Sequence, residues 1–299
     1  MNPIVGIGEV LWDIYPDGRK VAGGAPFNFA FHCHQLGHPA AIVSRVGDDD
    51  LGRALRERVR ELGLSDEFIQ TDPDHPTGTV RVTHDASKVP TYTITENVAW
   101  DHLAWDDTLA ALAETTRGAC FGTLALRGGA SAATIEEFVR NVSELCVFDV
   151  NLRQHFFAEE ALEWGLTLSD WVKMSAEELV RLAEMFGIEA DPGALFAKFH
   201  HEKLAPDQLL IVTQGADGAE MLYPARDECV CEPGVPANVV DTVGAGDSFT
   251  AAMVCMTREG RSLREAATFA VHYAARVCEH QGGTPTIDRA DVERAAGLS

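Results

Sequence analysis

The chain has 299 residues, of which 46% are hydrophobic, enough for one α/β domain with a full core. Its 24 basic and 46 acidic residues give a formal net charge of -22, so the mean field repels nucleic acids and anionic membranes. We therefore expect neither nucleic acid nor a membrane as a partner. A small phosphate ligand remains compatible with this charge, because it responds to the local field of its site.

The cysteine content favours a cytoplasmic protein with reduced thiols. The chain has 7 cysteines, an odd number, and no Cys-x-x-Cys motif. Cys229 and Cys231 form a Cys-x-Cys motif, which by itself is a poor zinc signature. The first residues lack the basic and apolar regions of a signal peptide, and no apolar run has the length of a membrane span.

The beginning of the chain alternates apolar runs with helical periodicity. Residues 4–14 predict a buried first strand, and residues 25–37 predict a helix with proline in its first turn and glycine at its end. Residues 40–47 predict a second strand, and residues 51–63 predict a helix whose apolar side chains share one face.

Residues 77–96 have a different pattern. Their β-branched side chains occur in near alternation around a turn at residues 85–87, which predicts a hairpin with one polar face. Together with residues 10–22, this hairpin would form a small sheet outside the main layer.

From residue 118 onward, predicted strands alternate with predicted helices, which implies a mostly parallel sheet covered by helices. The strands are expected at 119–126, 145–152 and 209–215, and helices at 131–144 and 176–187. In open α/β sheets, ligands bind beyond the carboxyl ends of the strands. The loops that follow the strands are therefore the places to search for a site.

The most informative loop is DTVGAGDSFT, residues 241–250. Gly244, Ala245 and Gly246 leave backbone amides unobstructed, and the positive end of the following helix dipole points to the same place, so the loop predicts a phosphate site. Asp247 would repel phosphate unless it has a task there, such as accepting a proton from an attacking hydroxyl. It would equally suit the N-cap of the helix, and local physics does not decide between these roles.

Two motifs together identify a family resemblance. DTVGAGDSFTAA resembles the C-terminal signature of the ribokinase-like, PfkB-type sugar kinases, and AGGAPFNFAFHCHQLG, residues 22–37, is similar to their N-terminal signature. The resemblance covers essentially the whole chain. It implies one three-layer α/β/α ribokinase-like domain over residues 1–299, with a mostly parallel central sheet and a small β-sheet lid formed by about 10–22 and 77–102. It also implies phosphoryl transfer from ATP to a sugar hydroxyl.

The resemblance assigns roles to the signature residues. Asp247 matches the general base of the family, and the amides of Gly244, Ala245 and Gly246 match its anion hole. Three further positions match residues that hydrogen-bond the sugar: Asp13, Gly24 and Asn28. The structural alternatives are a turn residue for Asp13 and a polar residue at a helix start for Asn28.

Residues that follow two later strands match phosphate-binding positions of the family. Asn151 and Arg153 match positions near the phosphates and the sugar, although Arg153 also suits a plain surface site. Many members carry Asn-x-x-Glu where this chain has Ser175 and Glu178, a pair that is also an ordinary capping box. The resemblance implies that Glu178 is linked to Mg²⁺ through water, and that Lys173 approaches the nucleotide phosphates.

Weaker matches concern the nucleotide and a monovalent cation. The glycine-rich turn with Thr213, Gly215 and Gly218 resembles the nucleotide loop of the family, and an ordinary hairpin turn is the alternative. His272 resembles part of the wall around the adenine. Asp241 resembles an oxygen ligand of a monovalent cation such as K⁺.

Details of the lid resemble the fructokinase branch, chiefly YTITENVAWD at 92–101 and FGTLALR at 121–127. We therefore expect D-fructose as substrate, phosphorylated at O6. Trp100 and Trp12 offer ring faces to the sugar, and the alternative is that both rings belong to the core of the lid, the more common place for tryptophan. Ribose, 2-keto-3-deoxygluconate, other ketoses and nucleosides remain alternatives, as does a sensor that binds sugar and nucleotide without turnover. A lid hairpin with one apolar face also suggests a homodimer formed through the lids.

Overall fold

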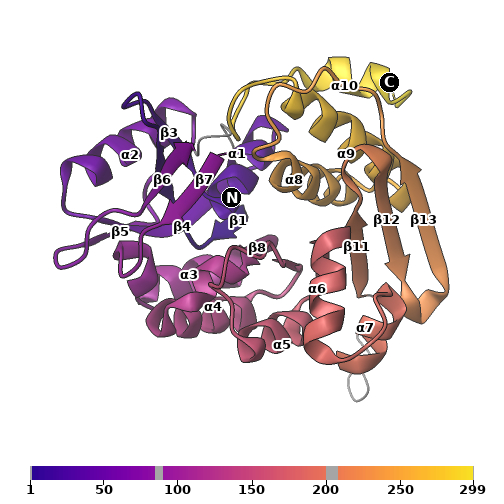
Figure 1. Ribbon diagram of the computed structural model, residues 1–299, viewed down its shortest axis with the longest axis horizontal. Helices are drawn as coiled ribbons and strands as arrows, with labels where there is room; N and C mark the ends of the chain where they lie inside the picture. The colour runs from indigo at the N-terminus through magenta and orange to yellow at the C-terminus, as the bar shows by residue number, and fades with distance from the viewer. Residues whose placement is uncertain (1, 85–89, 200–207, 299) are drawn as a thin grey trace.

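Helices cover both faces of the main sheet, which explains why its central strands are apolar along their whole length. The computed structural model describes residues 2–84, 90–199 and 208–298. The strand order is β13-β12-β11-β10-β9-β8-β1-β4-β5 (Figure 1). Neighbours from β5 to β11 run parallel, and β12 and β13 extend the sheet in antiparallel fashion. The strands are β1 (Ile4–Ile7), β4 (Ala40–Gly47), β5 (Ile69–Asp72), β8 (Gly118–Gly122), β9 (Cys146–Asp149), β10 (Trp171–Ser175), β11 (Leu209–Thr213), β12 (Gly218–Tyr223) and β13 (Glu228–Pro233).

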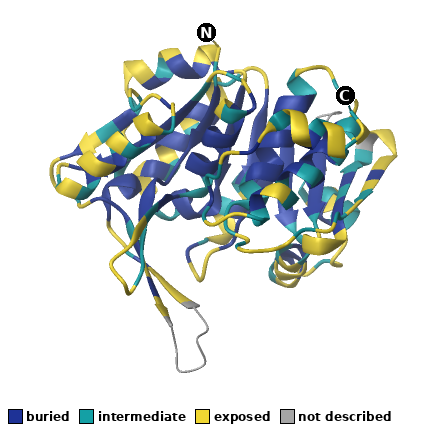
Figure 2. Ribbon diagram, turned by 90° about the horizontal axis from the view of Figure 1, so that it is seen from above, coloured by how far each residue is buried: buried dark blue, intermediate teal, exposed yellow. Residues whose placement is uncertain are grey.

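The helices form the two outer layers of a three-layer α/β/α fold, as predicted. One face carries α1 (Ala25–Gln35), α2 (Asp50–Glu61), α8 (Ala245–Arg258), α9 (Leu263–Cys278) and α10 (Arg289–Ala295). The other face carries α3 (Asp107–Thr115), α4 (Gly129–Asn141), α5 (Glu159–Leu168), α6 (Ala176–Phe186) and α7 (Pro192–Phe199). Figure 2 shows buried residues concentrated in the strands and on the helix faces turned toward them. No helix within the described ranges is long and apolar enough to cross a bilayer.

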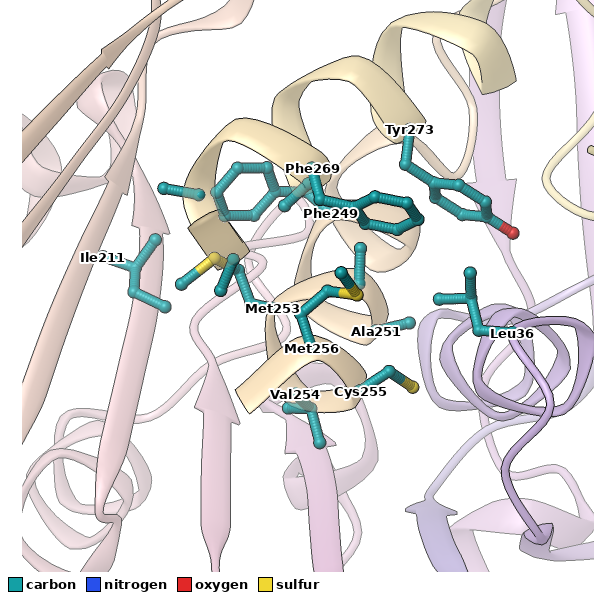
Figure 3. Packing of buried hydrophobic residues seen from close by; sticks show 14 of the residues in the cluster. Leu36, Ile211, Phe249, Ala251, Met253, Val254, Cys255, Met256, Phe269 and Tyr273 are labelled. Atoms are coloured by element: carbon teal, nitrogen blue, oxygen red, sulfur yellow. The ribbon is translucent and has the colours of Figure 1, made fainter. Parts of the chain in front are cut away.

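Helix α8 lies at the centre of the core on its side of the sheet. Its residues from Ser248 to Met256 are all buried, so the helix is apolar around its circumference, as a central helix must be. Figure 3 shows Phe249, Met253 and Met256 packed between Phe269 of α9 and Ile211 of β11. Helix α1 packs against the same helix. This packing fixes the position of the first turn of α8 relative to α1.

The small sheet has the strand order β3-β2-β6-β7. Its strands are β2 (Leu11–Ile14), β3 (Lys20–Gly23), β6 (Thr79–His84) and β7 (Pro90–Ile94). The predicted hairpin is therefore present in its described part, while its expected turn at 85–87 lies outside the described residues. The residues of this sheet come from the expected lid segments; their closure over a substrate and a homodimer through them remain predictions.

Two expected strands have different limits in the structure. The run 4–14 is not one strand, because the chain turns at Gly8, whose φ is 146°, so that β1 and β2 belong to different sheets. The run 119–126 leaves the sheet after Gly122 and continues as the 3-10 helix η2 (Thr123–Arg127). In both cases the sequence shows one continuous apolar run, which predicts a single strand. The structure splits the run into two elements, because tertiary packing buries its two halves in different places.

A buried ion pair anchors the segment that returns from the small sheet. Arg127 donates from Nε and Nη2 to the carboxylate of Asp101 at 2.8 and 3.0 Å, and both side chains are 8% exposed. Nη2 also donates to the carbonyl oxygen of Thr95 at 2.7 Å, and the guanidinium lies 4.0 Å from the ring centre of Trp100. These contacts hold the 3-10 helix η1 (Ala99–His102) against η2.

We predict that Asp101→Asn lowers the free energy of unfolding by about 3 kcal/mol or more, because it leaves the buried guanidinium of Arg127 without a counter-charge. Chemical denaturation of the variant and the parent measures the difference. Asp74→Asn, at an exposed position, is the control and should change the value by no more than about 0.5 kcal/mol. Equal effects of the two substitutions would contradict this role.

Candidate active site

Asp247 lies inside the first turn of α8 and does not cap it. The N-cap is Gly244, with φ 78° and ψ 0°, and the helix begins at Ala245. A side chain at Gly244 would place its Cβ 2.6 Å from the Cα of Gly283, so the loop needs glycine both for its backbone angle and for this contact. The N-cap role left open by the sequence is therefore wrong for Asp247.

The first turn of α8 offers backbone donors. The leading N–H groups of a helix have no acceptor within the helix, and they lie at the positive end of its dipole. The N–H of Ala245 donates to the carbonyl oxygen of Thr242 at 3.3 Å. The N–H groups of Gly246 and Asp247 have no acceptor among the hydrogen bonds of the described chain. An anion at this point would therefore meet at least two unengaged amides.

A hydrogen bond joins Asp247 to the other signature motif. Asn28, in the first half of α1, donates from Nδ2 to Oδ2 of Asp247 at 2.8 Å across 219 positions of sequence. Asn28 is buried, and its Oδ1 has no partner among the described residues. The bond leaves Oδ1 of Asp247 without a hydrogen bond in the described chain. Asn28 thus holds Oδ2 of Asp247 in place, and Oδ1 can accept a hydrogen bond or a proton from another group.

A third segment closes around this bond. His32 of α1 donates from Nε2 to the carbonyl oxygen of Gly283 at 2.9 Å and accepts from the hydroxyl of Tyr273 through Nδ1. Burial lowers the pKa of His32 to about 4, so the ring is neutral at physiological pH and can make both bonds. Gly283 in turn packs against the side chain of Asn28. The loop before α10 is therefore held at the start of α8.

The surroundings of Asp247 keep its carboxyl group less acidic than usual. The residue retains a small exposed surface, yet burial of the carboxylate raises its pKa above the ordinary value. The bond from Asn28 and the charges of Lys173 and Arg153 act in the opposite direction. A carboxylate with a raised pKa in a crevice is better suited to accept a proton than one fully solvated.

Lys173 lies behind the first turn of α8. Its Nζ donates to both oxygens of Asp149 at 3.0 and 3.2 Å, and a Cβ on Gly246 would lie 2.7 Å from the same nitrogen. Burial would lower the pKa of Lys173, but Asp149, Glu178 and Asp247 outweigh it, so the net direction is upward and the group stays charged. The sequence suggested an approach to the nucleotide phosphates; the structure places this charge beneath the glycine backbone, in contact with Asp149.

The charge of Arg153 acts on Asp13 as well as on Asp247. Burial raises the pKa of Asp13 to about 6, and Arg153 opposes this shift. Arg153 is exposed, and its charge also acts on Asp247. Oδ2 of Asp13 lies 3.0 Å from where a Cβ would stand on Gly23, the last residue of β3. Gly24 follows as the N-cap of α1 and packs against the backbone of Glu9.

Glu9 belongs to this site and was not predicted. It follows the carboxyl end of β1, is 2% exposed, and accepts the N–H of Ala25 through Oε1 at 3.1 Å. Its Oε2 has no partner among the described residues. Burial raises the pKa of Glu9 to about 7, with the charge of Asp247 adding to the shift and Arg153 opposing it. A charged residue inside the apolar run 4–14 was the sequence signal that could have identified it.

The chain matches the family of pfkB carbohydrate kinases over residues 13–290. It is a member of this family. An uncharacterized sugar kinase from Pyrococcus horikoshii is 29% identical over 304 residues, covering 95% of this chain and 92% of the relative. A fructokinase of Klebsiella pneumoniae is 27% identical over 274 residues, covering 83% of this chain and 82% of the relative.

Solved structures agree with the fold. The Pyrococcus horikoshii kinase in complex with ATP superposes with a TM-score of 0.81 over 96% of each chain, at 27% identity. A fructokinase double mutant from Vibrio cholerae, in a fructose, ADP and potassium ion bound form, superposes with a TM-score of 0.80 over 98% of each chain, at 22% identity. The ribokinase-like fold expected for this carbohydrate kinase is thereby confirmed.

Two acidic residues expected to serve cations in the PfkB site are held by backbone N–H groups. Glu178 accepts from Leu152 through Oε1 at 2.7 Å and from Ser175 through Oε2 at 2.8 Å, so the capping box is real. Asp241 accepts from Val243 and Gly282 at 3.1 and 2.9 Å. Each carboxylate oxygen keeps a lone pair beyond these bonds, so hard cations fit both groups, most readily through water at Glu178.

The residues expected to contact the nucleotide lie on several segments in the second half of the chain. Thr213 ends β11, and Gly215 and Gly218 bound the 3-10 turn that leads into β12, with φ values of 58° and 107°. Since β11 and β12 are antiparallel, this loop is a hairpin turn as well as a candidate nucleotide loop. His272 lies on α9 and bonds the carbonyl oxygen of Thr268 at 2.9 Å. Asn151 is buried, with φ 38°, directly after β9.

The stacking roles expected for two tryptophans find no support. Trp100 is fully buried, with its ring between Arg127 and Gly78. Trp12 is 8% exposed, and its Nε1 donates to the carbonyl oxygen of Leu51 at 3.0 Å. Both rings stabilise the base of the small sheet, because a large apolar side chain at such a junction is buried against its neighbours.

The burial of Glu9 predicts a pH effect on stability. A native pKa near 7, above the ordinary 4.5, means that ionising this group destabilises the folded chain as the pH rises from about 4.5 to 7. Glu9→Gln should remove this cost, so the variant gains up to about 3 kcal/mol over the parent between pH 5 and pH 8. Denaturant unfolding at the two pH values measures this gain, and a constant difference between the proteins would contradict it.

Proposed function

We propose that the chain transfers the γ-phosphoryl group of ATP to a sugar hydroxyl, with D-fructose, phosphorylated at O6, as the favoured acceptor. The observation that carries the proposal is Asp247, placed in the first turn of α8, bonded to Asn28 through one oxygen and free at the other. A carboxylate beside unengaged amides can accept a proton where the amides receive charge.

The reaction follows from this arrangement. The sugar hydroxyl gives its proton to Oδ1 of Asp247 while its oxygen forms a bond to the γ-phosphorus. The bond from that phosphorus to the bridging oxygen breaks, and ADP leaves with the electron pair. The N–H groups of Gly246 and Asp247 would donate hydrogen bonds to the equatorial phosphoryl oxygens. Lys173, behind Gly246, adds positive charge at the same point without needing contact with the phosphate.

The acceptor would lie between the small sheet and the start of α8. Asp13, on the small sheet, and Asn28, on α1, are short polar groups suited to neighbouring hydroxyls of a sugar. Arg153 would compensate the charge that develops during transfer. Glu178 would hold Mg²⁺ through water, and Asp241 would contribute to a K⁺ site; bound Mg²⁺ supplies charge neutralisation on the phosphates.

Support for the cofactors and the sugar comes from the relatives. The Pyrococcus horikoshii structure contains ATP, and the Vibrio cholerae structure contains fructose, ADP and potassium ion. The Klebsiella pneumoniae relative is a fructokinase. At 27% identity a few pocket side chains decide between ketoses and other sugars, so ribose and 2-keto-3-deoxygluconate are the alternative acceptors.

We predict that Asp247→Asn lowers kcat by a factor of roughly 10² to 10⁴ while the dissociation constant of the sugar changes little, because the amide keeps the shape but accepts no proton. A coupled assay of ADP release gives kcat, and calorimetry gives sugar binding. Asp74→Asn, at an exposed carboxylate outside the proposed site, is the control and should keep the kcat of the parent. A kcat of Asp247→Asn close to that of the parent would disprove the base assignment.

The substrate is tested by the same assay against fructose, ribose, 2-keto-3-deoxygluconate, tagatose, glucose and adenosine. We expect the highest kcat/KM with fructose. A preference for another sugar would keep the mechanism and reject the fructose assignment. ATP binding without turnover on any acceptor would instead favour the sensor function.

A further inference from the structure

Three potential metal ligands meet on the two strands at the outer edge of the main sheet, β12 and β13. Cys229 and Cys231 are alternate residues of the edge strand β13, so their side chains leave the same face of the sheet. Glu220 on β12 is paired with Cys231, which places its side chain on that face too. Both cysteines are exposed, and Glu220 is partly exposed.

The distances among these ligand atoms fit a tetrahedral metal ion. The Sγ atoms of Cys229 and Cys231 are 3.8 Å apart, and Sγ of Cys229 is 3.5 Å from Oε1 of Glu220. Bonds of about 2.3 Å to sulfur and about 2.0 Å to oxygen at a tetrahedral angle require separations of about 3.8 and 3.5 Å. Potential ligand atoms of all three residues lie within 4.8 Å of one another.

We propose that Glu220, Cys229 and Cys231 bind a thiophilic divalent cation, with Zn²⁺ as the best-suited ion and water in the fourth position. Thiolate ligands select such ions over Mg²⁺, whose preferred ligands are oxygen atoms. In the part of the chain that the structure describes, this is the one cluster of three His, Cys, Asp or Glu residues with such spacing. The site is therefore chemically separate from the magnesium and potassium positions of the kinase reaction.

The backbone favours this site before any ion binds. β12 and β13 are paired from Gly218 to Tyr223 on one strand and from Glu228 to Pro233 on the other, so the ladder holds the ligands in register. Only the side chains have to rotate, and the thiol protons pass to solvent when the metal binds. The open fourth position and the exposure of the cysteines make an exchangeable surface site, in contrast to a closed structural zinc centre with four protein ligands.

A cobalt titration tests the site directly. The 299-residue chain, kept reduced with a phosphine, is titrated with Co²⁺, and the thiolate-to-cobalt charge-transfer band and the visible bands of tetrahedral Co²⁺ are recorded. We expect saturation at one ion per chain and displacement by Zn²⁺ but not by excess Mg²⁺. Absence of the charge-transfer band in the parent chain would overturn the proposal.

Variants distinguish this cluster from the other thiols. Cys229→Ser and Cys231→Ser should each weaken Co²⁺ binding by more than about 100-fold, because even outer-shell changes cost roughly 10 to 100-fold. Glu220→Gln should weaken binding while keeping the thiolate band. Cys278→Ser, on α9 and outside the cluster, is the control and should bind like the parent.

Folding is monitored independently of the metal. Cys229 and Cys231 are exposed on the edge strand β13. The unfolding transitions of the two serine variants without metal, and their kinase turnover, should therefore match those of the parent. If folded serine variants bind Co²⁺ as tightly as the parent, the ion is bound elsewhere and the proposal is wrong.

Discussion

The hydrogen bond from Asn28 to Asp247 is the constraint on which the rest of the site depends. It joins the helix of the N-terminal signature to the helix of the C-terminal one, and α1 and α8 pack along each other behind it. His32 and Gly283 close the third side. Each helix begins after a glycine: a Cβ on Gly24 would meet the backbone of Glu9, and a Cβ on Gly244 would meet that of Gly283, so both helix starts pack closely against neighbouring loops.

The same arrangement bears on how a chain of net charge -22 would hold a phosphate group at the proposed site. Several acidic side chains belong to the candidate site around Asp247. Burial raises the pKa of Glu9 to about 7 and that of Asp13 to about 6, so both are weaker acids than usual. Lys173 and Arg153 supply positive charge, and the dipole of α8 adds its positive end. These groups provide local positive charge for a phosphate in a molecule whose net charge is negative.

The sequence predicted those parts of the site that rest on local patterns. The glycines around Asp247, the start of α1 and the alternation of strands and helices are properties of short segments, and the structure has them. The sequence did not predict Glu9 in the crevice or the contact of Lys173 with Asp149, because both depend on which strand ends lie side by side. Trp100 was assigned to the sugar for its chemistry, whereas its position at the base of the small sheet buries it.

The division of residues 4–14 has the same origin. Gly8 and the charged Glu9 are the marks of a change of sheet in this run, and neither shows without the structure that β1 and β2 belong to different sheets. Local signals therefore predicted residues of the candidate site. Tertiary contacts decide which other side chains lie beside them and shift their pKa values.

A structure of the chain with fructose and a non-hydrolysable ATP analogue would test the central claim most directly. The account predicts one sugar hydroxyl within about 3.2 Å of Oδ1 of Asp247, with Asn28 still bonded to Oδ2 and the terminal phosphate at the amides of Gly246 and Asp247. A sugar whose hydroxyls all lie beyond hydrogen-bond distance of Asp247, with the terminal phosphate away from the first turn of α8, would contradict it.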